Sequence, residues 1–148
     1  MKRISEYTIR GSILDNTVKR LLLDDGRFDT GYVVESFLLY PEDPTASNSE
    51  VYGCLATIAQ TATSDWNAAL NTQIGWSSTR TDGAYGVAAP FQALDPDNLI
   101  IQDLFLYAND GTGSSSAVIN YLIKLVKYEF PEARGALAMV RNNSQGYD

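Results

Sequence analysis

A turn-rich segment between two long β-type runs constrains the fold of this chain most strongly. Residues 95–130 have the sequence DPDNLIIQDLFLYANDGTGSSSAVINYLIKLVKYEF, in which Asn, Asp, Gly, Thr and Ser make up residues 109–116. Two β-type runs separated by such residues predict a β-hairpin, with strands near 99–108 and 118–128. Because a long hairpin needs a second layer to cover its apolar face, we expect a scaffold of packed strands.

The second of these strands is apolar on both faces. One face carries Ile119, Tyr121, Ile123 and Leu125, and the other carries Val118, Leu122, Val126 and Tyr128. An outer strand of a sandwich normally has one wet face. We therefore expect one face to fill the core and the other to be covered by a C-terminal helix or by a neighbouring subunit.

Shorter β-type runs precede this block. Alternating or apolar segments punctuated by Gly, Pro, Asn and Asp predict strands near 6–13, 18–23, 28–40, 51–61 and 74–80, and a short strand near 87. The Asp24-Asp25-Gly26 sequence predicts a hairpin turn between the second and third of them. A short helix is predicted at 65–70, capped by Ser64 or Asp65.

The C-terminal end has a different pattern. Residues 131–141 begin with Pro131 and Glu132 and end with Arg141, which is typical of a helix of about three turns. Its apolar positions, Ala133, Ala136, Leu137 and Val140, lie on one face. We expect this helix to dock against the strands or against a neighbouring subunit. The polar tail that follows contains Tyr147 and should be ordered only by a partner.

Size and charge set further limits. The 148 residues are about one domain long, so we expect residues 1–130 to form a β-domain and residues 131–148 to be a helix and tail of the same domain. The net charge of −7 disfavours contact with nucleic acid, and the basic residues are dispersed. Partners should therefore be proteins or neutral ligands.

Several kinds of chemistry lack the residues they need. The chain has no histidine and a single cysteine, Cys54, which excludes Ser-His-Asp systems, imidazole zinc sites and internal disulfides. Cys54 lies in an apolar run, and we expect it to be buried. No glycine pattern for phosphate binding, no membrane span and no signal peptide are visible. We expect a soluble protein without a cofactor or metal.

Carboxylates are the remaining catalytic option, because glycosidases need only two of them. The candidate pairs are Asp24 with Asp25, Glu42 with Asp43, and Asp95 with Asp97. All three pairs lie in predicted turns, where such residues bond their own backbone. Asp103 interrupts an apolar run, and a wet strand face or an interface bond explains it more simply. Asp95 and Asp97 lie at one end of a predicted strand about 33 Å long and Asn109 and Asp110 at the other, so they cannot chelate one calcium ion within that hairpin.

Aromatic residues in the irregular middle of the chain suggest a binding surface. Trp66, Trp76, Tyr85 and Phe91 could form a platform on which a sugar or a partner side chain stacks. Packing in the core or in an interface is the commoner role of such residues. Both interpretations are retained.

The strand pattern predicts an antiparallel β-sandwich, specifically a jelly roll, with a short C-terminal helix. In residues 98–128 and 132–141 the chain resembles the small β-sandwich structural proteins of bacteriophage virions, which occupy capsid, decoration or tail positions. The resemblance implies a non-enzymatic protein that self-assembles with copies of itself and with other structural proteins, in a virion assembled in the host cytoplasm. The lack of a basic arm favours an outer or accessory position.

Two other functions are compatible with the same residues. One is a carbohydrate- or ligand-binding β-sandwich module that uses Trp66, Trp76 or Tyr85. The other is a carboxylate-dependent glycoside hydrolase that uses Asp103. For the assembly hypothesis, the candidate interaction residues at the C-terminus are Leu137, Val140 and Tyr147.

Overall fold

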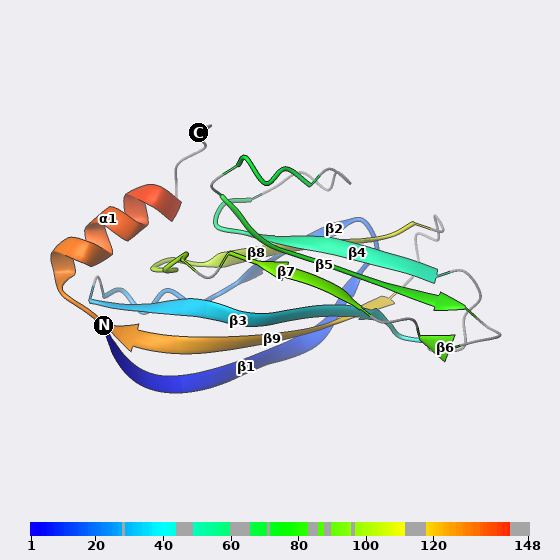
Figure 1. The fold of residues 1–148 in the computed structure, drawn as a ribbon, viewed down its shortest axis with the longest axis horizontal. Coiled ribbons are helices and arrows are strands. Elements are labelled where there is room, and N and C mark those ends of the chain that lie inside the picture. The colour runs from blue at the N-terminus through cyan, green and yellow to red at the C-terminus, as the bar shows by residue number, and fades with distance from the viewer. Residues whose placement is uncertain are drawn as a thin grey trace.

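The protein is a sandwich of two antiparallel sheets followed by one short helix (Figure 1). The computed structural model describes residues 1–27, 29–43, 49–59, 66–70, 72–82, 86–87, 90–95, 97–111 and 118–142. The predicted all-β class and the C-terminal helix are both confirmed.

The smaller sheet has three long strands in the order β1-β9-β3. They are β1 (Lys2–Leu14), β9 (Val118–Glu129) and β3 (Thr30–Pro41). The central strand β9 pairs with both neighbours along almost its whole length, so that Ile123 lies between Ile9 and Phe37. This sheet forms one layer of the sandwich, with β1 at its outer rim (Figure 1).

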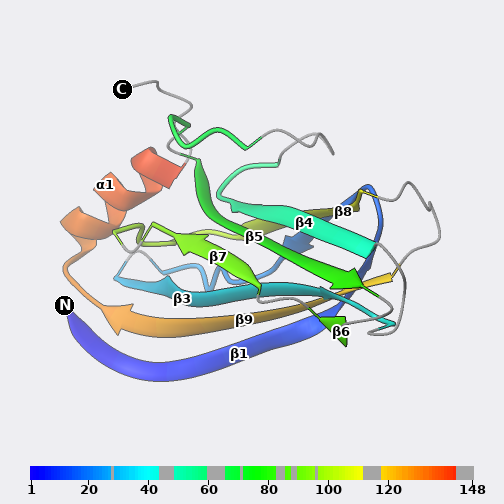
Figure 2. The same cartoon turned by 45° about the vertical axis from the view of Figure 1, so that its right-hand side comes forward.

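The larger sheet has the order β2-β8-β4-β5-β6, and β7 also pairs with β5. Its strands are β2 (Thr17–Leu21), β8 (Leu104–Asp110), β4 (Ser49–Ala56), β5 (Gln73–Asp82), β6 (Gly86–Val87) and β7 (Phe91–Leu94). Figure 2 shows this sheet stacked over the smaller one. Each predicted strand segment overlaps a strand of the structure, but the predicted strand at 99–108 begins only at Leu104, and residues 57–59 lie outside β4. Strand β7 was not predicted.

The predicted pairing of these strands is wrong in two places. Strands β8 and β9 follow one another in the chain, but β8 pairs with β2 and β4, whereas β9 pairs with β1 and β3. The turn-rich segment between them therefore links the two sheets and is not a hairpin. The Asp24-Asp25-Gly26 segment also joins strands of different sheets, because β2 and β3 do not pair. Both β8 and β9 are central strands, and two neighbours already use their backbone groups.

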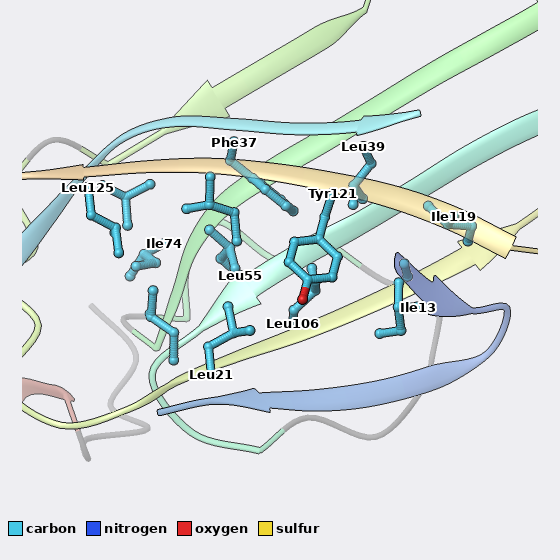
Figure 3. Close-up of a cluster of buried hydrophobic side chains, with 14 of the residues drawn as sticks. Ile13, Leu21, Phe37, Leu39, Leu55, Ile74, Leu106, Ile119, Tyr121 and Leu125 are labelled. Atoms are coloured by element: carbon cyan, nitrogen blue, oxygen red, sulfur yellow. The ribbon is translucent and has the colours of Figure 1, made fainter. Parts of the chain in front are cut away.

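The core lies between the two sheets (Figure 3). All four residues predicted on one face of β9 are buried there: Ile119, Tyr121, Ile123 and Leu125. They face residues of the larger sheet such as Leu55 and Leu106, which are fully buried. Cys54 is also fully buried, and burial raises the pKa of its thiol to about 12. The thiol is therefore protonated and unreactive.

The opposite face of β9 is only partly covered. Val126 is buried, whereas Val118, Leu122 and Tyr128 are half-buried. Near Tyr128 the cover is a small cluster built from Leu99, Ile101 and Phe130, against which Val33, Tyr128 and Ala138 pack. Because Ala138 belongs to the helix α1 (Glu132–Asn142), the helix covers one end of this face and leaves the rest open.

The side of α1 that docks is not the side predicted from the sequence. Gly135 is buried and Ala138 half-buried against the sandwich, whereas the predicted apolar positions Ala133, Ala136, Leu137 and Val140 are exposed. Small residues allow a helix to approach its neighbour closely, which explains the contact through Gly135 and Ala138. The larger apolar residues thus remain available on the outside.

Other local predictions have mixed outcomes. Residues 66–70 form a turn rather than part of a helix, because the Asn67 side chain accepts a hydrogen bond from the Ala69 amide at 3.0 Å. Such side-chain bonds compete with helix formation. The predicted cap residues, Ser64 and Asp65, and the candidate residues Tyr85 and Tyr147 lie outside the described residues.

The two edges of the smaller sheet differ. The β3 edge is closed by groups of the second layer: Ser77 Oγ accepts from the Leu39 amide at 3.1 Å, and Thr79 Oγ1 donates to the Leu39 carbonyl at 2.6 Å. Gln92 accepts from the Phe37 amide, and Tyr32 exchanges two backbone hydrogen bonds with Ile100 at 2.8 and 2.7 Å. Among the described strands, β1 pairs only with β9, on its inner side, and its outer edge has no strand partner.

Candidate functional site

Four aromatic side chains gather on the outer face of the larger sheet. This aromatic cluster consists of Tyr52 from β4, Trp66, Trp76 from β5 and Phe91 from β7. The rings of Trp66 and Phe91 stack with centroids 6.0 Å apart and an interplanar angle of 20°. Tyr52 meets Trp66 edge-on at 6.5 Å. Both arrangements are favourable aromatic geometries.

One glutamine side chain holds the cluster in place. Gln73 Oε1 accepts hydrogen bonds from the Asn67 amide at 2.9 Å and from the Trp76 indole Nε1 at 3.1 Å. The first bond anchors the turn that carries Trp66, and the second orients the ring of Trp76. Since Gln73 is buried, these bonds are sheltered from water. The rings are therefore positioned before any ligand arrives.

The cluster surrounds a shallow pocket of about 180 Å³, lined by Trp66, Ala68, Trp76, Phe91 and Ala93. That volume is below the roughly 300–1,000 Å³ of most small-molecule sites. Phe91 and Trp66 remain 51% and 38% exposed, so their ring faces are accessible. The lining is almost wholly apolar, and the pocket can hold one sugar ring face or one apolar side chain.

The sequence-based aromatic platform is thus brought together in part. Trp66, Trp76 and Phe91 do converge, although they lie in three separate segments of the chain. The sequence did not indicate Tyr52, because strand pairing alone brings it near the other rings. Tyr52 on β4 pairs with Ser78 on β5, and Ser78 pairs in turn with Phe91 on β7. The fourth predicted residue, Tyr85, lies outside the described residues.

A second exposed apolar feature lies on α1. Leu137 and Val140 are 73% and 68% exposed and occupy the same face of the helix as Ala133 and Ala136. We call these four residues the α1 stripe. The helix stands at one end of the sandwich (Figures 1 and 2), so the stripe is separate from the core of its own chain. Leu137 and Val140, the two C-terminal candidate interaction residues that the structure describes, are therefore at the surface.

The carboxylate of Asp103 has a structural role. It is buried and accepts hydrogen bonds from the amides of Leu23 at 2.8 Å and Asp24 at 3.0 Å. Arg20 donates to its second oxygen at 2.7 Å and forms an ion pair at 2.5 Å. Burial alone would raise the pKa of Asp103, but these hydrogen bonds outweigh burial and lower it. An ionised carboxylate engaged in this way is not a general acid.

A cavity of about 300 Å³ lies beside this carboxylate. Its lining includes Arg20, Asp24, Thr57, Gln102 and Asp103. Within it, the acidic oxygens of Asp103 are directed at the chain that follows β2, where they hold backbone amides. The acidic residue Asp103 therefore stands in an apolar run because it binds the chain segment that follows β2.

Three of the predicted turn carboxylates, Asp24, Asp25 and Asp95, bond nearby backbone amides as expected. Asp24 accepts from the Gly26 amide at 2.8 Å, Asp25 from the Arg27 amide at 3.0 Å, and Asp95 from the Asp97 amide at 3.0 Å. Asp110 accepts from the Ser49 hydroxyl at 3.0 Å within the sheet. In the described part of the chain, no three acidic or cysteine side chains come together as a metal site.

No protein-family model matches the sequence, and no curated protein is similar to it. Among the described residues, no helix has both the length and the apolar character needed to cross a membrane.

Proposed function

We propose that the protein is a non-enzymatic structural protein of a bacteriophage particle, in a capsid, decoration or tail position, and that it self-assembles through protein contacts. The observation that carries this proposal is the exposed α1 stripe. Leu137 and Val140 stand on a helix that already uses its small residues to dock on its own chain. Large apolar residues in such a position are typical of a surface that a second protein covers.

The order of the strands supports the same proposal. The orders β1-β9-β3 and β2-β8-β4-β5 interleave the two sheets, with the chain crossing between layers after β1, β2, β3 and β8. We interpret this order as a jelly roll, in which β7 has turned away from β3 to pair with β5. Jelly rolls form viral capsid domains and lectin domains. The fold therefore fits assembly, although a fold alone does not determine function.

The charge of the chain favours a position away from the genome. The net charge is −7, and the basic residues do not form an arm or a stripe in the sequence. A surface of this kind repels nucleic-acid phosphates on average. An outer or accessory position in the particle is the consistent choice.

Multi-angle light scattering over a range of protein concentrations tests the assembly. We expect wild-type oligomers and a largely monomeric Leu137→Gln/Val140→Gln variant, since glutamine keeps helix propensity but removes the apolar contact. Leu22→Gln is the matched control, because Leu22 is equally exposed, at 78%, but lies far along the chain from α1. A wild-type protein that stays monomeric at high concentration, without binding other particle proteins, would contradict the proposal.

Deletion of residues 131–148 provides a coarser test. Assembly should be lost while a folded β-domain persists by circular dichroism, because most of the core lies between the two sheets. Loss of the whole folded signal would instead show that α1 belongs to the monomer core.

The aromatic cluster supports a second candidate function, a carbohydrate- or ligand-binding module. Its stacked, accessible rings of Trp66 and Phe91 are suited to the apolar face of a sugar. Screening a glycan panel by tryptophan fluorescence should then give saturable binding that Phe91→Ala and Trp76→Ala abolish. Binding that persists in both variants would place the ligand elsewhere, and a strictly monomeric protein with such binding would favour this function over assembly.

A further inference from the structure

The free edge of β1 is unusually long and regular. β1 covers Lys2–Leu14, and most of its residues are exposed. Its one irregularity relative to β9 lies between Arg3 and Ser5, so residues 5–14 form an uninterrupted edge. In the part of the chain that the structure describes, β9 alone pairs with β1, and Figures 1 and 2 both show the strand at the rim of the sheet. Such an edge presents a row of unpaired backbone groups.

Natural proteins protect edges of this kind by specific devices, namely proline, charged side chains and above all lysine, bulges or a covering segment. Residues 5–14 contain neither proline nor lysine, and their two charges, Glu6 and Arg10, have opposite signs and can pair with those of a second copy. On the other side of the same sheet, the β3 edge is covered by Ser77, Thr79 and Gln92. The contrast indicates that the β1 edge is kept open for a partner strand.

We propose that the partner is β1 of a second copy, paired antiparallel about a twofold axis. This inference rests on the proposed function and names one of its contact surfaces. An antiparallel pair related by a twofold axis matches residue i with residue j of the copy, and both must point to the same face. The axis must therefore coincide with a residue position on the strand.

The charges select that position. Glu6 and Arg10 are the only charged side chains between residues 4 and 14, and they lie on the same, outer face of the strand. When the axis passes at Thr8, Glu6 of each copy faces Arg10 of the other, and the two Thr8 side chains face each other. Moving the axis by one residue in either direction places Glu6 opposite Thr8 or Ser12 and leaves no charge pair. Opposite charges and Thr pairs are favourable across strands.

The inner face is compatible with the same register. Tyr7 then lies opposite Ile9 of the copy, which is a favourable aromatic and β-branched pair. Tyr7 is 46% exposed in the single chain, where it meets only the edge of the Tyr32 ring at 6.0 Å among described aromatic rings. The two three-stranded sheets become one six-stranded sheet, β3-β9-β1-β1-β9-β3.

Two different contacts would then act in one assembly. The β1 contact is isologous and closes a dimer, whereas the α1 stripe at the end of the sandwich remains free to link dimers. A chain with both contacts can grow beyond two copies, as a particle component must.

A cysteine at the axis tests the register directly. In Thr8→Cys, the two thiols lie opposite each other with Cβ atoms about 4.5–5.5 Å apart, close to disulfide geometry. Ser12→Cys is the matched control on the same face, because its two copies would be about 27 Å apart. The native Cys54 is buried and does not compete. With oxidised glutathione, we expect at least about tenfold more cross-linked dimer for Thr8→Cys than for Ser12→Cys.

Charge reversal tests the pairing without cysteines. Glu6→Arg alone and Arg10→Glu alone place like charges opposite each other, and each should weaken the β1 dimer about tenfold or more. An equimolar mixture of the two variants restores both opposite-charge pairs and should form heterodimers as tight as the wild-type dimer. The double variant Glu6→Arg/Arg10→Glu should also dimerise and serves as the control for folding.

The outcomes separate this inference from the proposed function. If the wild-type protein assembles but Thr8→Cys cross-links no better than Ser12→Cys, or if the mixture stays as weak as its components, the β1 pairing is wrong and assembly stands. If the wild-type protein does not assemble at all, the proposed function fails together with the β1 pairing.

Discussion

At the β3 edge of the smaller sheet, side chains of the opposite layer complete the backbone hydrogen bonds, whereas the β1 edge of the same sheet has no such cover among the described residues. The covering groups are Ser77 and Thr79, which lie buried on the inward face of β5. Polar residues on the inward face are expensive unless they are hydrogen-bonded. Here they replace a strand, so one edge is sealed within the monomer and the other is left for a partner.

Truncating a core residue beside the sealed edge should have the largest effect. Leu39 on β3 is fully buried, and we expect Leu39→Ala to lower the free energy of unfolding by about 2–5 kcal/mol. Leu14→Ala at the end of β1 is the matched control, since Leu14 is 52% exposed, and should change it by about 0.5 kcal/mol or less. Urea denaturation followed by fluorescence measures both. A similar loss of unfolding free energy in the two variants would show that β3 is no more firmly packed than the end of β1.

Removing one sealing hydroxyl should have a smaller effect. Thr79→Val keeps the side-chain shape but leaves the buried Leu39 carbonyl without this donor, which should cost about 1–3 kcal/mol. The same change on the open edge, Thr8→Val, alters an exposed residue and should cost about 0.5 kcal/mol or less. An equal cost at both positions, measured by urea denaturation, would show that the hydroxyl does not seal the β3 edge.

One glycine on each edge strand has a different neighbour. A Cβ at Gly31 on β3 would lie 2.9 Å from the Ile100 carbonyl oxygen, which is backbone, and we expect Gly31→Ala to cost about 1–2 kcal/mol. A Cβ at Gly11 on β1 would instead meet the hydroxyl end of the Tyr121 side chain at 2.7 Å, which is not backbone. Thermal unfolding should therefore show a larger loss for Gly31→Ala. A larger loss of thermal stability for Gly11→Ala than for Gly31→Ala would show that β1, not β3, is the more tightly packed edge strand.

The smallest effect concerns the end of β2, an edge strand of the larger sheet, where the chain is held by Asp103. The folded-state pKa of Asp103 is lowered below its unfolded value, which is about 3.9. Its contribution to stability is therefore present above about pH 4 and is lost as the pH falls through the folded-state pKa. The stability difference between wild type and Asp103→Asn, measured in urea between pH 3 and pH 7, should shrink at the acidic end. A difference that does not change with pH would contradict this role.

Local patterns predicted the elements well because strand and helix formation depend on neighbouring residues. Alternation identified β1, the apolar runs identified β8 and β9, and Pro131 with Glu132 marked the start of α1. The residues of the predicted aromatic platform come together in part, and their role in binding stays a prediction. Trp66, Trp76 and Phe91 were proposed because they are aromatic residues in the irregular middle of the chain, and they line one pocket.

The predictions from the sequence were wrong or incomplete for features that depend on contacts between residues far apart in the chain. The turn-rich segment after Asp110 predicted a hairpin, yet β8 and β9 entered different sheets because each is paired on both sides by other strands. Asp103 is an acid within an apolar run, and its partners Arg20, Leu23 and Asp24 lie about 80 residues away in the chain. No local signal reveals such partners.

Composition and periodicity are properties of the chain alone, and they were enough to predict the all-β class, the positions of most strands, the C-terminal helix and the lack of histidine chemistry. The strand pairing, the face of α1 that docks and the sheet edge that stays open became known from the folded structure. These choices depend on backbone hydrogen bonds and contacts between segments far apart in the chain, as when Thr79 on β5 seals Leu39 on β3. Pairing energy is non-local, and local sequence does not encode it.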